Sequence, residues 1–113
     1  VATLRRAAIS KGESLMKINR QERAHEITLG LEGRLDTTTA PMLEAELKHS
    51  IVGADTLIFD LKDLEYISSA GLRVLLSAQK VMNKQGKMVV RNVNEDVMEV
   101  FDITGFIDIL TIE

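Results

Sequence analysis

The stretch LIFDLKDLEYISSAGLRVLL, Leu57 to Leu76, changes from a strand pattern to a helix pattern and decides the fold. Its first three residues form a continuous apolar run, which is typical of a central and often parallel strand covered on both faces. From Ser69 to about Lys84 the apolar residues recur at helical spacing. The stretch therefore predicts a strand that leads into a helix, with Ser68 and Ser69 at the junction.

The helix expected after the serines has one apolar face and one polar face. The apolar row consists of Leu75, Ala78 and Met82, widened by Val74 and Val81. The polar face carries Arg73, Ser77, Lys80 and Lys84. We expect the first face to pack on a sheet and the second to face solvent.

Strand and helix patterns alternate along the rest of the chain. Apolar residues occupy every second position from Glu26 to Leu35, as in a half-buried strand, and residues 17–21 supply a strand before it. The other expected elements are a helix capped by Thr38 or Thr39, a strand at residues 88–90 and a helix between Asn94 and Gly105. This order predicts an α/β fold with right-handed crossovers and helices on a small sheet.

The composition is that of one ordinary globular domain. The chain has 113 residues, of which 45% are hydrophobic and 27% are charged. It contains no cysteine, which excludes disulfides and thiol chemistry and fits a reducing cytoplasm. No apolar run approaches the ~20 residues that span a bilayer. We therefore expect a cytoplasmic protein without a membrane segment.

The charge distribution argues against direct binding of nucleic acid. The net charge is −3, and residues 16–113 hold 11 basic and 16 acidic side chains. One tyrosine, three phenylalanines and no tryptophan offer no aromatic stacking platform. We expect no direct contact with DNA or RNA.

Residues 1–15 differ in character from the rest of the chain. They carry three basic side chains and one acidic one, without an apolar stretch long enough for a secretory signal. We expect them to form a poorly ordered N-terminal extension, leader or tag, with a short ordered helix as the alternative. Residues 16–113 are then the folded domain.

The sequence lacks the usual motifs of metal sites and enzymes. His25 and His49 are the only histidines, and no cluster has metal-ligand spacing, so we expect no metal and no cofactor. Glycine-rich nucleotide loops are missing, and no glycine lies two residues before Ser69 to form a hydrolase elbow. We predict that the protein is not an enzyme. A small serine enzyme, with Ser69, a histidine and an aspartate as its triad, ranks third among our hypotheses.

The adjacent serines have two interpretations. Either hydroxyl can cap the helix by accepting a hydrogen bond from a backbone N–H. A serine at a helix N-terminus is also exposed, and the helix dipole favours a phosphate there. Phosphorylation would add about −1.5 to −2 charges at one point on the surface. The residues alone leave both interpretations open.

Four segments, in this order, strongly resemble the STAS domain of bacterial anti-sigma factor antagonists. They are GRLDTTTAPML (Gly33–Leu43), LIFDLKDLEYISSAGLRVLL (Leu57–Leu76), GKMVVRNV (Gly86–Val93) and VFDITGFIDILTI (Val100–Ile112). The resemblance implies a small mixed sheet of four to five strands with helices packed mainly on one face. It also implies a partner-switching protein whose unphosphorylated form binds an anti-sigma factor of the GHKL serine-kinase type and so releases the sigma factor. Phosphorylation by that kinase ends the complex, and a PP2C-type phosphatase restores it.

The resemblance assigns roles to individual residues. The family's D-S-[ST]-G-L element falls on residues 68–72, so Ser69 corresponds to the phosphorylated serine. Gly71 and Leu72 correspond to the tight entry into the helix. The acidic residue of the family's G-x-[LIV]-D element corresponds to Asp36.

Two positions depart from the family pattern. Ser68 stands where the family has an aspartate, which removes a charge that could assist partner recognition. Ala70 stands where the family has Ser or Thr. Ser69 is therefore the better match to the phosphorylation site, and Ser68 is the alternative.

We predict that a partner binds two loops and the helix that follows the second one. The residues are Asp36, Thr37, Thr38, Thr39, Ser68, Gly71, Leu72, Arg73 and Ser77. The kinase would supply ATP, magnesium and the general base. The second hypothesis keeps the fold without the switch: a constitutive STAS-type subunit of a transport or lipid-trafficking complex.

Overall fold

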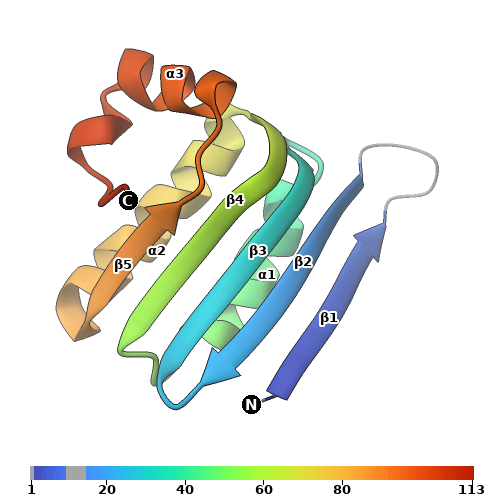
Figure 1. Cartoon of the computed structure of the whole chain (residues 1–113), viewed down its shortest axis with the longest axis vertical. Coiled ribbons are helices and arrows are strands. Elements are labelled where there is room, and N and C mark those ends of the chain that lie inside the picture. The colour runs from blue at the N-terminus through green and yellow to red at the C-terminus, as the bar shows by residue number, and fades with distance from the viewer. Residues whose placement is uncertain (1, 10–14) are drawn as a thin grey trace.

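The computed structural model describes residues 2–9 and 15–113, which form a five-stranded mixed sheet and three α-helices (Figure 1). The strands are β1 (Ala2–Ile9), β2 (Leu15–Arg23), β3 (Glu26–Leu35), β4 (Thr56–Ile67) and β5 (Lys87–Arg91). The helices are α1 (Ala40–Ser50), α2 (Ser69–Gln85) and α3 (Glu95–Thr104), followed by the 3-10 helix η1 (Phe106–Asp108). The predicted α/β class is confirmed.

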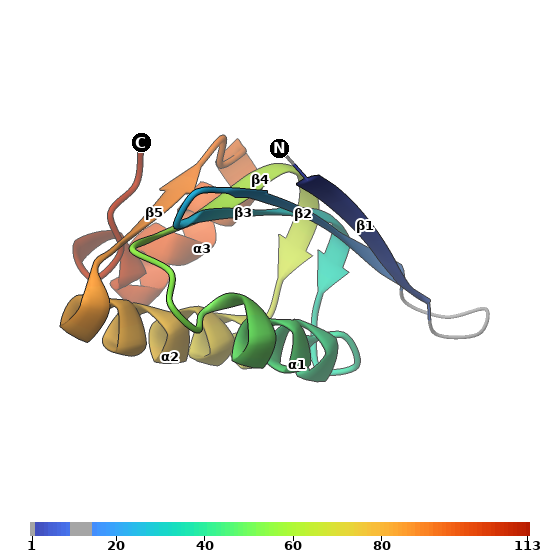
Figure 2. The same cartoon turned by 90° about the horizontal axis from the view of Figure 1, so that it is seen from below.

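The strand order in the sheet follows the chain, β1-β2-β3-β4-β5. β2 pairs antiparallel with both β1 and β3, whereas β4 pairs parallel with both β3 and β5. Helix α1 connects β3 to the adjacent β4, and α2 connects β4 to the adjacent β5, so both crossovers move in the same direction across the sheet. Because such crossovers are right-handed, both helices lie on the same face of the sheet (Figure 2). The prediction of helices mainly on one face is confirmed.

The hydrophobic core lies between this face of the sheet and the two helices. Leu57, Ile58 and Phe59 of β4 are all buried, as the apolar run predicted. On α2 the expected inward residues Leu75 and Met82 are fully buried. Val81 is an exception, because 41% of it is exposed in a groove that α1 does not fill.

Two register shifts between β3 and β4 lengthen β4 beyond the predicted strand. The first shift lies between the pairs that Gly30 and Glu32 make with β4. The second lies between the pairs of Gly33 and Arg34. Gly33 has a φ of 99°, which a residue with a side chain rarely adopts. Extra residues on β4 change its burial period, so that Leu64 and later Ile67 return to the core. The pairs between these buried positions are exposed: Lys62 with Asp63, and Glu65 with Tyr66.

The N-terminal region contains a strand that the sequence analysis did not predict. β1 pairs antiparallel with β2. The rest of the expected extension, residues 1 and 10–14, lies outside the described residues, and the domain boundary at Met16 stays a prediction. None of the helices in the described part of the chain is long and apolar enough to cross a membrane.

Candidate functional site

The carboxyl ends of β3 and β4 bring the two predicted loops together. Leu35 and Ile67, the last residues of these parallel strands, are register partners. The backbone N–H of Ser68 donates to the carbonyl of Leu35 at 2.9 Å. Asp36 and Ser68 therefore leave the sheet side by side, which is where ligand sites of open parallel sheets usually form.

The two serines have different environments. Ser68 is the N-cap of α2: its backbone is extended, and its hydroxyl accepts from the N–H of Gly71 in a long contact of 3.5 Å. Ser69 is the first helical residue and is exposed. Within the described residues the Ser69 hydroxyl has no hydrogen-bond partner. Capping thus falls to Ser68, and Ser69 presents its hydroxyl to solvent.

The carboxylate of Asp36 organises the loop between β3 and α1. It accepts hydrogen bonds from the N–H of Thr38 at 3.0 Å, from the Thr38 hydroxyl at 2.7 Å and from the N–H of Thr39 at 3.2 Å. The Arg34 guanidinium lies 3.7 Å away. Because the Asp36 side chain is only 16% exposed, its main role in this geometry is to hold the loop.

Three residues of the predicted partner surface are buried. Thr39 is 0% exposed, and its hydroxyl accepts from the N–H of Asp36 at 2.8 Å and donates to the carbonyl of Arg34 at 2.8 Å. Gly71 and Leu72 are also buried. These residues support the surface from below. The exposed members of the set are Thr37, Thr38, Arg73 and Ser77, and Ser69, the predicted phosphorylation site, is exposed beside them.

Gly71 is required by close packing between α2 and the strand ends. A Cβ atom there would lie 2.7 Å from Cγ of Leu35 and 2.9 Å from Cγ1 of Ile67. Both of these side chains are buried and cannot easily move. The absence of a side chain at Gly71 therefore sets the position of the helix start and of Ser69.

Arg34 and Tyr66 lie beside the loops and were not among the predicted site residues. The Arg34 guanidinium lies 4.2 Å from the centroid of the Tyr66 ring, a cation–π distance, and nearly half of each residue is exposed. The two residues are register partners on β3 and β4. The sequence does not predict this pair, because the register of Arg34 and Tyr66 depends on the two shifts between β3 and β4.

A groove between α1 and α2, here called the α1–α2 groove, begins next to the loops. The part of the groove next to the loops has a volume of about 420 Å³ and is lined by Thr37, Pro41, Arg73 and Ser77 among others. Glu44, Val74 and Ser77 also line a second, mostly apolar hollow of about 180 Å³ further along the helices. The exposed predicted residues Thr37, Arg73 and Ser77 therefore border a surface that a partner's side chains can enter.

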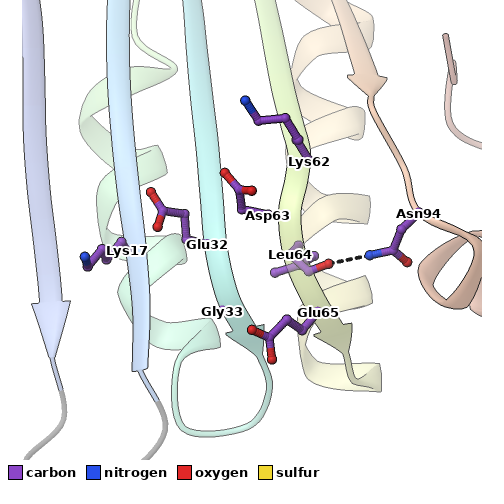
Figure 3. Close-up of a pocket in the computed structure, with 8 residues that line it drawn as sticks. All are labelled: Lys17, Glu32, Gly33, Lys62, Asp63, Leu64, Glu65 and Asn94. Atoms are coloured by element: carbon purple, nitrogen blue, oxygen red, sulfur yellow. Dashed lines mark hydrogen bonds between the residues drawn. The ribbon is translucent and has the colours of Figure 1, made fainter.

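A polar hollow of about 470 Å³ lies on the opposite, open face of the sheet (Figure 3). Lys17 and Lys62 lie there among Glu32, Asp63 and Glu65, so the hollow favours neither anions nor cations. None of the predicted site residues lines it. In the described residues no group of three His, Asp or Glu side chains could hold a metal ion.

Neither histidine lies beside Ser69. His25 is in the turn between β2 and β3, and its carbonyl accepts from the N–H of Asp55 before β4 begins. His49 is in the last turn of α1, the end far from the Asp36 loop. The serine triad of our third hypothesis is therefore not assembled in this structure.

Comparison with known proteins matches residues 17–113 to the STAS domain family. The BtrV protein of Bordetella bronchiseptica is 42% identical over 84 residues, which cover 73% of this chain and 72% of BtrV. The anti-sigma-B factor antagonist of Bacillus subtilis is 31% identical over 98 residues, which cover 86% of this chain and 90% of that protein.

Solved structures share the fold at low sequence identity. An anti-sigma factor antagonist from Mycobacterium paratuberculosis matches with a TM-score of 0.79 and 19% identity, over 86% of this chain and 84% of that one. The Bacillus cell fate determinant SpoIIAA, in its phosphorylated form, matches with a TM-score of 0.68 and 17% identity, over 85% of this chain and 90% of that one.

Proposed function

This chain belongs to the STAS domain family, and we propose that it acts there as an anti-sigma factor antagonist controlled by phosphorylation of Ser69. The Bacillus subtilis relative is an anti-sigma-B factor antagonist, and a protein of the same fold has been solved in a phosphorylated form. The role places the protein in the cytoplasm, where sigma factors act.

The division of roles between the two serines is the observation that carries this proposal. Ser68 caps α2, so the helix start does not depend on the hydroxyl of Ser69. Ser69 is exposed at the first helical position, where backbone N–H groups and the helix dipole favour an anion. A phosphate can therefore be added to Ser69 without removing the cap.

The unphosphorylated partner surface consists of the exposed predicted residues Thr37, Thr38, Ser69, Arg73 and Ser77 together with the α1–α2 groove. An anti-sigma factor of the GHKL serine-kinase type binds this surface and releases its sigma factor. The domain contributes only the acceptor hydroxyl and is not itself an enzyme. The Ser69 oxygen attacks the γ-phosphorus of ATP, ADP leaves, and a base of the kinase takes the hydroxyl proton.

Phosphorylation ends binding through local electrostatics. The new dianion lies four residues from Arg73 on the same helix, so it competes for a cation that the free surface offers to the partner. It also repels the anionic nucleotide in the kinase. A loss of ~3 kcal/mol of binding free energy lowers the affinity more than a hundredfold. A PP2C-type phosphatase removes the phosphate and restores binding.

Phosphosite mapping tests the proposal. The protein is incubated with ATP and the GHKL kinase encoded in the same cell, and the modified residue is located by mass spectrometry. We expect one phosphate that is absent from Ser69→Ala and present in Ser68→Ala, the matched control. A phosphate that survives Ser69→Ala, or that is lost only from Ser68→Ala, would contradict the assignment.

A further inference from the structure

The negative charge of the chain is concentrated in its C-terminal region. Residues 1–91 contain all 14 Lys and Arg with 11 Asp and Glu, whereas residues 92–113 contain six carboxylate side chains and no basic residue. Four of the six lie on α3: Glu95, Asp96, Glu99 and Asp102. No Lys or Arg of the described residues forms an ion pair with any of these four.

The stability of α3 does not account for this arrangement. Glu95 and Asp96 in the first turn interact favourably with the helix dipole. Glu99 is repelled by Glu95 one turn before it, and Asp102 lies near the C-terminal end, where the dipole disfavours an anion. Two of the four carboxylates therefore oppose the helix that carries them.

Exposed apolar side chains accompany the carboxylates. Ile103 is 77% exposed, and Ile107 and Ile109 are exposed by nearly half. A hollow of about 780 Å³ lies beside α3, and it is lined by all four carboxylates together with Val93, the half-buried Met98 and Ile107. Apolar surface rimmed by charge is characteristic of interaction sites.

We propose that this α3–η1 surface, a hollow lined by carboxylates and three apolar side chains, binds a basic amphipathic helix of a partner protein. Glu95, Glu99 and Asp102 have the spacing i, i+4, i+7 and extend over ~10 Å along the helix. Lysines at the same spacing on a second helix can face them, while apolar residues between the lysines enter the hollow at Met98 and Ile107. The charge complementarity selects a basic partner and rejects an acidic one.

The surface is distinct from the one proposed for the anti-sigma factor. α3 follows the carboxyl end of β5 and packs against β4, whereas α1 and α2, which form the α1–α2 groove, lie on one face of the sheet (Figures 1 and 2). Its occupant binds by charge and apolar contact with α3, so the inference does not rest on the role of Ser69.

Binding of a designed peptide to the full chain tests this inference. The probe is a helical peptide of about 18 residues in which leucines and the lysines that flank them share one face, titrated at low salt and followed by amide NMR shifts. We expect shifts centred on α3 and η1. Glu99→Lys with Asp102→Lys should weaken binding by about tenfold or more, because each reversal replaces attraction by repulsion. Asp102→Lys also suits the helix dipole, so the variant should fold.

Two controls make the test decisive. Glu26→Lys with Asp55→Lys makes the same change in net charge at exposed positions elsewhere and should leave the affinity within about twofold. A peptide in which serines replace the leucines should bind about tenfold more weakly, since the apolar contact is lost. The inference would be overturned if both charge reversals lowered the affinity equally or if both peptides bound equally well. It would also be overturned by shifts centred on the open face of the sheet, or by no binding.

Discussion

The junction from β4 to α2 and the junction from β5 to α3 have the same local design but different uses. At each, a polar residue with an extended backbone caps the helix by accepting from the N–H three residues ahead. At Asn94 this bond is 2.8 Å long, and the amide also donates to the carbonyl of Leu64 at 2.6 Å. At Ser68 the bond is 3.5 Å long, and the next residue has an exposed hydroxyl.

This comparison separates a structural junction from a functional one. Asn94 uses both ends of its side chain to fasten α3 to β4, so its polar atoms are committed to the fold. The serine junction is fastened by the close approach of Gly71 to the strand ends, and one hydroxyl stays available. Four substitutions test this difference, beginning with the largest expected effect.

Gly71→Val should destabilise the protein most, by about 3 kcal/mol, because its side chain would overlap the buried Leu35 and Ile67. Urea unfolding measures the loss. The control is Ala70→Val, one residue earlier at the edge of the groove, with an expected loss under about 1 kcal/mol. Equal losses for the two variants would show that packing at Gly71 does not fasten the junction.

Asn94→Ala should cost about 2 kcal/mol, since the N-cap is lost and the Leu64 carbonyl loses its partner. Asn94→Ser keeps a capping oxygen but lacks the amide donor, so it should recover roughly half of the loss. Full recovery by serine would mean that the bond to Leu64 contributes nothing.

Ser68→Ala should cost only about 0.5–1 kcal/mol, less than Asn94→Ala, because its capping bond is long and its side chain has no second partner among the described residues. The measurement is again urea unfolding. A loss as large as that of Asn94→Ala would remove the contrast between the two junctions.

Ser69→Ala should change the free energy of unfolding by less than about 0.5 kcal/mol, as expected for an exposed side chain that has no hydrogen-bond partner in the described part of the chain. The same variant should accept no phosphate. A loss above about 1 kcal/mol would show that the Ser69 hydroxyl supports the fold and is not free for modification.

Much of the fold was predictable because local patterns and chain order agree. The apolar run at residues 57–59 and the alternation in β3 gave the correct strands, and α3 was bounded correctly by Asn94 and Gly105. The full length of β4 was not predictable. It depends on bulges whose position follows from pairing with β3 and from the positive φ of Gly33.

The candidate site was predictable in its location but not in its details. Parallel strand ends bring Asp36 and Ser68 together, as expected. The sequence could not show that the Thr39 hydroxyl bonds the backbone of Asp36 and Arg34. The same hydroxyl could have capped α1, and the sequence does not decide between these hydrogen bonds. The pairing of Arg34 with Tyr66 depends on the same bulges as β4.

Calorimetric titration of the anti-sigma partner against two forms of this protein tests the central claim most directly. One form is unmodified and the other carries a single phosphate on Ser69. The account predicts that the phosphate weakens binding more than a hundredfold, ~3 kcal/mol, with an unchanged fold by circular dichroism. Equal affinities for the two forms would contradict it.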